Sequence, residues 1–353
     1  RASALASVQH LHLEHVLDKG QAGRTARADL LDLVGALADS PPGSYAKVMG
    51  ASAEAVSLLY NFTRPKNASL KATYLNRTLD PAHAGGGIWE RVHGLDVDPV
   101  DGGVHSLTFV NREARRVMVA FRGMCFGEAE ASGRQCEVDK CFGIRIRGFG
   151  DVSGQVYRGG APDSDCEQYA DRLDYGEQAE AIVHRAQEQF PSYAVLLTGH
   201  SVGGFLAIVT AARQPGVLQA LAVAPTPHRY AMTALYGFTE EALQALPAED
   251  LIATCDRYDC GINLAHADGG QAGVLMCLLE LDPEPLLCKA LPAEPFGDDP
   301  SWTRTLSRLF PATLPCKTTT HSWLRYQTLF SAREADGATP SHLPRCDPAY
   351  TPR

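Results

Sequence analysis

The chain has no excess of basic residues. Its 353 residues include 32 Lys and Arg against 41 Asp and Glu, which gives a formal net charge of −9 at pH 7. Proteins that bind nucleic acid neutralise phosphates with a basic stripe or patch, and this composition provides none. We therefore expect no nucleic-acid partner.

Two other kinds of pattern are missing. No run of about 18 apolar residues is free of charged or helix-breaking residues, so the sequence predicts no transmembrane helix. Structural zinc sites typically use C-x-x-C pairs. The closest cysteines here, Cys136 with Cys141 and Cys255 with Cys260, are each separated by four residues. We therefore expect no metal centre.

The chain has few asparagines, and most of them belong to one sequence motif. Three of the five asparagines, Asn61, Asn67 and Asn76, begin N-x-S/T sequons within a short segment. Sequons accept N-linked glycans on exposed segments, so we predict glycosylation at all three. The even number of cysteines, ten, favours disulfides in an oxidising compartment. We therefore expect the protein in the secretory pathway, either outside the cell or in a vacuolar or lysosomal lumen.

Hydropathy patterning divides the chain into two parts. Residues 1–100 combine helical periodicity with the sequons, which predicts a helical, glycosylated N-terminal extension. Residues 101–353 alternate strand-like and helix-like segments, a pattern typical of an α/β sheet. The expected strands are 105–110, 117–121, 194–197, 218–224 and 251–255, and the expected helices of this part include 175–190, 204–212 and 239–246.

Segment 125–166 differs in composition from the segments on either side of it. It is rich in glycine and polar residues and contains four cysteines, which predicts a long, disulfide-tied surface loop. The sequence does not fix the pairing of the cysteines. The candidate pairs among neighbours are Cys136–Cys141, Cys255–Cys260 and Cys277–Cys288.

The most specific motif lies between an apolar run and an apolar helix-like segment. Residues 199–203 read G-H-S-V-G, which predicts a nucleophile elbow, a strained strand-to-helix turn that exposes Ser201 above the sheet. Strand and helix cross so closely in such a turn that a Cβ atom would not fit at Gly199 or Gly203. The turn also places Ser201 at a helix N-terminus, where free N–H groups favour developing negative charge.

A serine nucleophile needs a histidine base and a carboxylate that orients the histidine. In α/β-hydrolases the acid and then the histidine follow the serine along the chain. His321 fits this order best, because it follows a cysteine that could hold its loop and it opens an amphipathic helix. The other histidines after Ser201 are His228, His266 and His342.

The acid is expected in a loop that follows a strand. The predicted strand 251–255 is followed by a turn, 256–260, that contains Asp256 and Asp259. We prefer Asp259 because the neighbouring Cys260 could hold it in place, and Asp256 stays open as the alternative. Asp250 and Asp268 lie further from the end of this strand.

These motifs together resemble the class 3 (fungal-type) lipases. That family has an apolar strand ending in F-R-G, found here at residues 121–123, and then G-H-S-x-G-G, found here at 199–204. His321 with the following serine, and Tyr326, are similar to the family's histidine segment. Ser201 and Asp259 are 58 residues apart and Asp259 and His321 are 62 apart, spacings typical of the family. The resemblance covers residues 100–330.

The resemblance implies an α/β-hydrolase fold, with a central, mostly parallel sheet flanked by helices. It implies a triad of Ser201, His321 and Asp259 that cleaves a carboxylic ester through an acyl-enzyme, with no cofactor. The oxyanion donors would be the N–H groups of Met124 and Val202. The family usually has Ser or Thr where this chain has Met124, so oxyanion binding would rest on backbone groups. The lid of the family follows the oxyanion strand, which makes 125–166 the lid candidate.

The expected substrate is a lipid ester of triacylglycerol or phospholipid type, met at a membrane or lipid-droplet surface. Three alternatives stay open. The chain could be a catalytically inactive, lipase-like binding or structural subunit, or an esterase that acts on cell-wall phenolic esters. The elbow could also be a nucleotide-binding turn, but that function predicts a G-x-G-x-x-G motif or a phosphate-binding lysine, and neither is present.

Overall fold

The computed structural model describes residues 51–53, 55–56, 58–60, 89–99, 102–124, 134–147, 164–226, 228–246, 251–256, 275–279 and 345–347. The sequons lie outside these residues, so glycosylation at Asn61, Asn67 and Asn76 stays a prediction, and Cys125, Cys260, Cys288 and Cys316 lie outside them as well. The candidate pairs Cys255–Cys260 and Cys277–Cys288 therefore also stay predictions.

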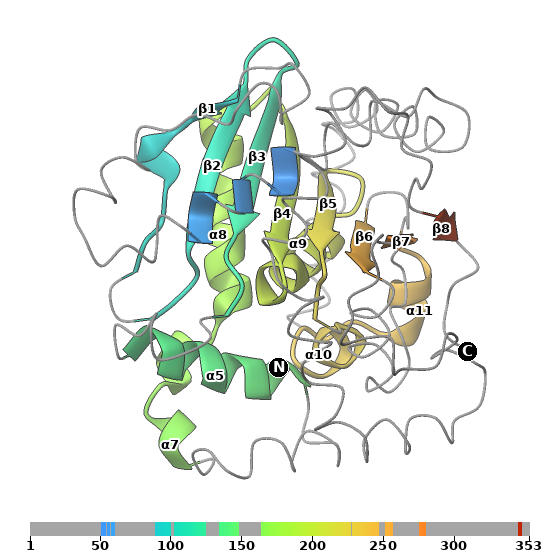
Figure 1. The fold of residues 1–353 in the computed structure, drawn as a ribbon. Coiled ribbons are helices and arrows are strands. Elements are labelled where there is room, and N and C mark those ends of the chain that lie inside the picture. Colours follow the sequence, from blue (N-terminus) through green and yellow to red (C-terminus); the bar gives the residue numbers. More distant parts are fainter. Residues whose placement is uncertain are drawn as a thin grey trace, which may run out of the picture.

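One eight-stranded sheet organises the described part of the chain, and its strands lie side by side in sequence order (Figure 1). The strands are β1 (Glu90–Arg91), β2 (Ser106–Asn111), β3 (Arg116–Phe121), β4 (Ala194–His200), β5 (Leu218–Val223), β6 (Leu251–Asp256), β7 (Leu275–Leu279) and β8 (Arg345–Asp347). Strands β1 to β3 pair antiparallel, β3 to β7 pair parallel, and β8 pairs antiparallel with β7. The sheet is therefore mostly parallel, as the α/β-hydrolase fold requires.

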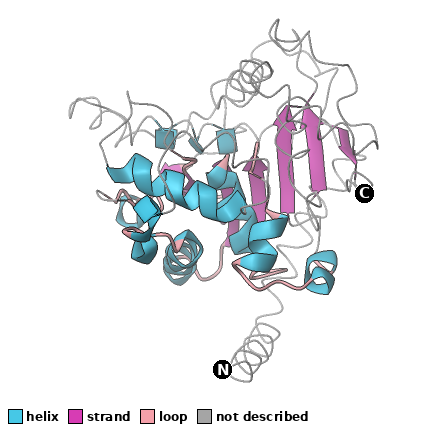
Figure 2. Ribbon diagram, turned by 90° about the horizontal axis from the view of Figure 1, so that it is seen from below, coloured by secondary structure: helices cyan, strands magenta, loops and turns pink. Residues whose placement is uncertain are grey.

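Helices pack around this sheet. The named helices are α5 (Arg134–Arg147), α7 (Ser164–Glu167), α8 (Tyr175–Gln189), α9 (Val202–Ala212), α10 (Arg229–Ala234) and α11 (Glu240–Gln244), with short 3-10 turns η1 (His93–Leu95) and η2 (Ala170–Arg172). Helix α9 packs against β3 to β6, and α8 lies beside it. The helical residues among 51–60 lie on the opposite face of the sheet (Figures 1 and 2).

Burial explains why these segments form these elements. All residues of β2 are buried, and so are all eleven residues of α9, an apolar helix enclosed between the sheet and its neighbours. Helix α8 buries a single stripe, and its N-terminus is capped by the Asp174 side chain, which accepts a hydrogen bond from the Glu177 N–H. The expected strands at 105–110, 117–121, 194–197, 218–224 and 251–255 are confirmed to within a few residues.

Segment 125–166 differs from its prediction as a surface loop. Residues Arg134–Arg147 form helix α5, whose inner face carries the fully buried Val138, Phe142 and Ile146. These residues recur at helical spacing, so they share one face, but the charged residues between them obscured the periodicity. The role of 125–166 as a lid stays a prediction.

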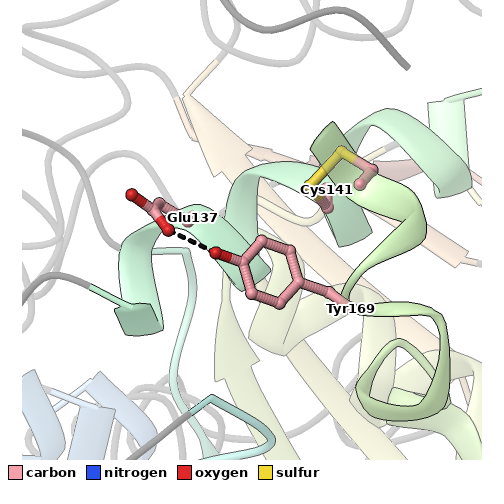
Figure 3. Close-up of a disulfide and its surroundings, with 4 residues drawn as sticks. Glu137, Cys141 and Tyr169 are labelled. Carbon is pink, nitrogen blue, oxygen red and sulfur yellow. Dashed lines mark hydrogen bonds between the residues drawn. A yellow bond between two sulfur atoms is a disulfide. The ribbon is translucent and has the colours of Figure 1, made fainter. Parts of the chain in front are cut away.

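The disulfide within this segment also differs from the candidate pair. Cys141 in α5 is bonded to Cys166 in α7, so the pair Cys136–Cys141 is wrong (Figure 3). Two cysteines five residues apart on one helix point to different sides, which prevents them from meeting. Cys136 is itself disulfide-bonded. The bond between α5 and α7 is flanked by a hydrogen bond from the Tyr169 hydroxyl to the Glu137 carboxylate.

Candidate active site

The turn between β4 and α9 has the geometry of a nucleophile elbow. Ser201 has φ 58° and ψ −122°, a backbone conformation that is unusual for a residue with a side chain. Such strain amounts to about 1–3 kcal/mol and persists only where the surrounding structure enforces it, often at active sites. Here the Ser201 N–H donates to the Val223 carbonyl at 3.1 Å, and its own carbonyl accepts from Phe205 at 3.0 Å and Thr226 at 3.2 Å.

The elbow depends on glycines at two positions. A Cβ atom added to Gly199 would collide with the backbone of Gly203 and lie 2.8 Å from the Gly204 nitrogen. A Cβ atom added to Gly203 would collide with the Phe121 carbonyl and lie 2.8 Å from the carbonyl carbon of Arg122. The expectation that neither position has room for a side chain is confirmed.

We expect the substitution Gly203→Ala to lower the free energy of unfolding by about 1–3 kcal/mol, because the methyl group meets backbone that cannot rotate away. Urea denaturation would measure the loss. Gly94→Ala is a matched control, because an added Cβ at Gly94 meets nothing within 4 Å. Equal stability of the two variants would contradict the close crossing of β3 and α9.

The loop after β3 lies directly beside the elbow. Phe121 pairs with Gly199 in the parallel register, so the next residues of the β3 chain run past Ser201. An added Cβ at Gly123 would collide with the Tyr60 hydroxyl and lie 3.1 Å from the Ser201 Cβ. Residues 122–124, which we call the R-G-M loop, therefore meet the elbow at Gly123.

Both candidate oxyanion donors lie at this junction. Val202 is the first residue of α9, so its N–H is one that the helix leaves without an i−4 carbonyl. Met124 ends the R-G-M loop, and its side chain is buried against α5, where a Cβ on Gly143 would collide with the Met124 sulfur. Because the Met124 side chain is directed into the protein core, only its backbone can serve an oxyanion.

A buried ion pair anchors the R-G-M loop to α5. The Arg122 guanidinium lies 3.0 Å from the Asp139 carboxylate, and both side chains are less than 10% exposed. The other Asp139 oxygen accepts hydrogen bonds from Gln135 at 2.8 Å and from the Tyr175 hydroxyl at 2.6 Å. Burial, and next the Asp139 charge, raise the pKa of Tyr175 far above its ordinary value, so its hydroxyl stays a neutral donor.

The backbone before the R-G-M loop is held as well. The Arg122 N–H donates to the His105 carbonyl at 3.0 Å, and the His105 imidazole is 3.0 Å from the Asp98 carboxylate. Burial lowers the pKa of His105, and the nearby Arg122 charge acts in the same direction although Asp98 opposes it. A small pocket lined by His105, Arg122, Gly123 and Val202 lies between this support and the elbow.

The remaining predicted site residues are placed only in part. Strand β6 ends at Asp256, which therefore belongs to the strand and not to the turn that was expected to include it. Parallel strands end at the same edge of a sheet, so Asp256 shares an edge with Ser201. Asp259 and His321 lie outside the described residues, and their roles stay predictions.

Sequence reasoning missed two residues of this site. Asp139 falls in the segment that was expected to be a loop, although its helical spacing from Gln135 and Phe142 was a usable signal. Tyr60 reaches the elbow from a distant part of the chain, and no pattern in the sequence marks it. No cluster of side chains suited to holding a metal ion occurs among the residues that the structure describes. Within the same residues, none of the helices has the length and apolar character of a membrane span.

Comparison with known proteins adds a family match. Residues 134–215, from α5 to just beyond α9, match the family model described as lipase (class 3). The chain is similar to the structure of a nonglycosylated LIP2 lipase from Yarrowia lipolytica, with 15% identity and a TM-score of 0.35 over 66% of this chain and 79% of that chain. It is also similar to a lipase from Rhizopus microsporus var. chinensis, with 11% identity and a TM-score of 0.32 over 68% and 74% of the two chains. No curated protein gives a significant match.

Proposed function

We propose that this chain is a class 3 lipase, as the match of residues 134–215 to that family's model supports, and that it is a serine acyl hydrolase that cleaves carboxylic esters of lipids through an acyl-enzyme. The observation that carries the proposal is the strained Ser201 at the apex of the β4–α9 turn, with the R-G-M loop against it. Ser201 is only 2% exposed in this structure, which differs from the exposed serine that the motif predicts. A serine at the apex of such a turn lies beside N–H groups of the two flanking segments, which can bind the oxyanion when the serine attacks a carbonyl carbon.

In the proposed reaction the Ser201 hydroxyl attacks the ester carbonyl while His321 accepts its proton. His321 then donates this proton to the leaving alcohol, and a water molecule, activated by the same histidine, releases the acid from Ser201. Asp259 orients the imidazole and stabilises its cationic form, with Asp256 as the alternative acid. The N–H groups of Met124 and Val202 bind the oxyanion, each contributing about 3 kcal/mol to the transition state.

The proposed substrates are triacylglycerols or phospholipids, met at a membrane or lipid-droplet surface. We propose further that the protein acts in the secretory pathway, extracellularly or in a vacuolar or lysosomal lumen. The sequons at Asn61, Asn67 and Asn76 and the disulfide between α5 and α7 support this location. None of the proposed steps needs a metal or an organic cofactor.

Covalent labelling of Ser201 tests the proposal. An alkyl fluorophosphonate mimics the tetrahedral intermediate of ester cleavage, so we expect it to modify Ser201 stoichiometrically, as peptide mass spectrometry would show. A triacylglycerol emulsion and a short soluble p-nitrophenyl ester, assayed in parallel, separate a lipase from an esterase of soluble substrates. Folded protein that neither labels at Ser201 nor hydrolyses either ester would be the inactive binding subunit.

A further inference from the structure

Tyr60 brings a phenol hydroxyl to the elbow from 140 residues earlier in the chain than His200. Its hydroxyl is 3.1 Å from Nδ1 of His200, the residue directly before the candidate nucleophile. The two rings meet edge to face, with centroids 5.9 Å apart and an interplanar angle of 68°. Both side chains are buried, so this hydrogen bond forms away from bulk solvent.

The same hydroxyl also contacts the R-G-M loop. At Gly123, the space that a Cβ atom would fill is occupied by three groups: the Tyr60 hydroxyl, the His200 carbonyl oxygen and the Ser201 Cβ. The last two would lie 2.7 and 3.1 Å from that Cβ, and the Tyr60 hydroxyl would collide with it. Tyr60 therefore touches both segments that supply the proposed oxyanion donors.

The position of Tyr60 is fixed by the core and not by the site. Ala55, Leu58 and Leu59, in the same helical segment, are each less than 5% exposed and belong to the main hydrophobic core. Tyr60 itself is 4% exposed. A side chain anchored in this way has lost its rotamer freedom on folding, so its hydroxyl is preorganised.

We propose that Tyr60 is a positioning residue for ester hydrolysis, because its hydroxyl holds His200 and Gly123 at the separation that brings the Met124 and Val202 N–H groups together. This role rests on the proposed acyl-hydrolase function. Oxyanion stabilisation requires donors that are already in place when charge develops on the substrate oxygen. Removing the hydroxyl leaves space beside Gly123, so the R-G-M loop and the elbow can separate and the transition state loses more than the ground state.

The substitution Tyr60→Phe tests this role, because it removes the hydroxyl and keeps the ring. We expect kcat for a soluble p-nitrophenyl ester and the rate constant for phosphonylation of Ser201 to fall about tenfold, as the loss of one productive hydrogen bond predicts. KM and the fraction of enzyme that titrates with fluorophosphonate should stay within about twofold, since ground-state binding is unaffected. A merely structural role would instead lower the titratable fraction and the melting temperature.

Tyr193→Phe is the matched control. Tyr193 lies just before β4, at the end of that strand opposite to His200, and its ring is tilted by 47° against the Phe190 ring with a centroid distance of 5.3 Å. It should label and turn over like the wild-type protein. If wild-type protein labels at Ser201 and Tyr60→Phe labels at the same rate, this inference is wrong while the proposed function stands. If wild-type protein does not label at all, the proposed function fails first.

A double-mutant cycle asks whether Tyr60 acts through His200. In the background of His200→Leu, which removes the imidazole that the Tyr60 hydroxyl contacts, adding Tyr60→Phe should change kcat by less than about twofold, because contacting residues of one network are not additive. A full tenfold loss in that background would show that the hydroxyl does not act through His200, and it would overturn the positioning role.

Discussion

Ser201→Ala is expected to lower kcat/KM for any ester that the protein hydrolyses by at least about a thousandfold, since removing a serine nucleophile from a triad has effects of this size or larger. Stability should change little, because the Ser201 hydroxyl is not a cap of α9 and alanine keeps the Cβ that the elbow already accommodates. The measurement is a soluble-ester assay at equal concentrations of folded protein, with thermal melting in parallel.

Ser192→Ala serves as the matched control for this variant. Ser192 is an exposed serine in the turn before β4, remote from the elbow along the same strand, and its replacement should leave both rate and stability unchanged. Retention of most of the activity in Ser201→Ala would mean that another residue carries the chemistry. The acyl-enzyme proposal for Ser201 would then be rejected.

Asp139→Ala is expected to lower the free energy of unfolding by about 3–5 kcal/mol, the range observed when one partner of a buried ion pair is removed. The physical reason is the Arg122 guanidinium, which would stay buried without the carboxylate that balances its charge. The Tyr175 hydroxyl and the Gln135 amide would lose their acceptor in the same step. Chemical denaturation measures the change, and esterase activity should fall with it because Arg122 begins the R-G-M loop.

Two comparisons make this prediction specific. Asp171→Ala removes an exposed aspartate from η2 and should change stability by less than about 0.5 kcal/mol. Replacing both members of the pair, as Arg122→Met with Asp139→Leu, should recover much of the stability that Asp139→Ala loses, since apolar residues of similar size leave no unbalanced charge. A double variant as unstable as Asp139→Ala would contradict this account of the pair.

The sequence predicted most of the sheet and the elbow because their signals are local. Each of these features is determined by about ten consecutive residues, the range over which periodicity and turn chemistry act. They are the β2–β3 hairpin, the apolar strand β4 and the glycines around Ser201. The elbow also has a steric requirement that few residues satisfy, so its motif is nearly unambiguous once a strand and a helix flank it.

The support around the elbow could not be predicted in the same way. Asp139 and Tyr60 matter because they meet Arg122 and His200 in space, and such meetings depend on the packing of segments far apart in sequence. The bond between Cys141 and Cys166 is a similar case, because the geometry of two helices selects the partner and the spacing of the cysteines does not. In α5, the polar residues Gln135 and Asp139 form buried hydrogen bonds and an ion pair, whereas the sequence pattern predicted an exposed polar loop.

The sequential order of the strands determines which segments of the chain can cover each face of the sheet. Crossovers between parallel strands are right-handed in nearly all proteins, so a run that always moves in one direction, as β3 to β7 does, leaves its connecting helices on one face. The opposite face then needs a cover from outside that run. The described residues among 51–60 lie on it, and Ala55, Leu58 and Leu59 contribute their side chains to the core (Figures 1 and 2). The segment that carries Tyr60 thus also covers part of this side of the sheet.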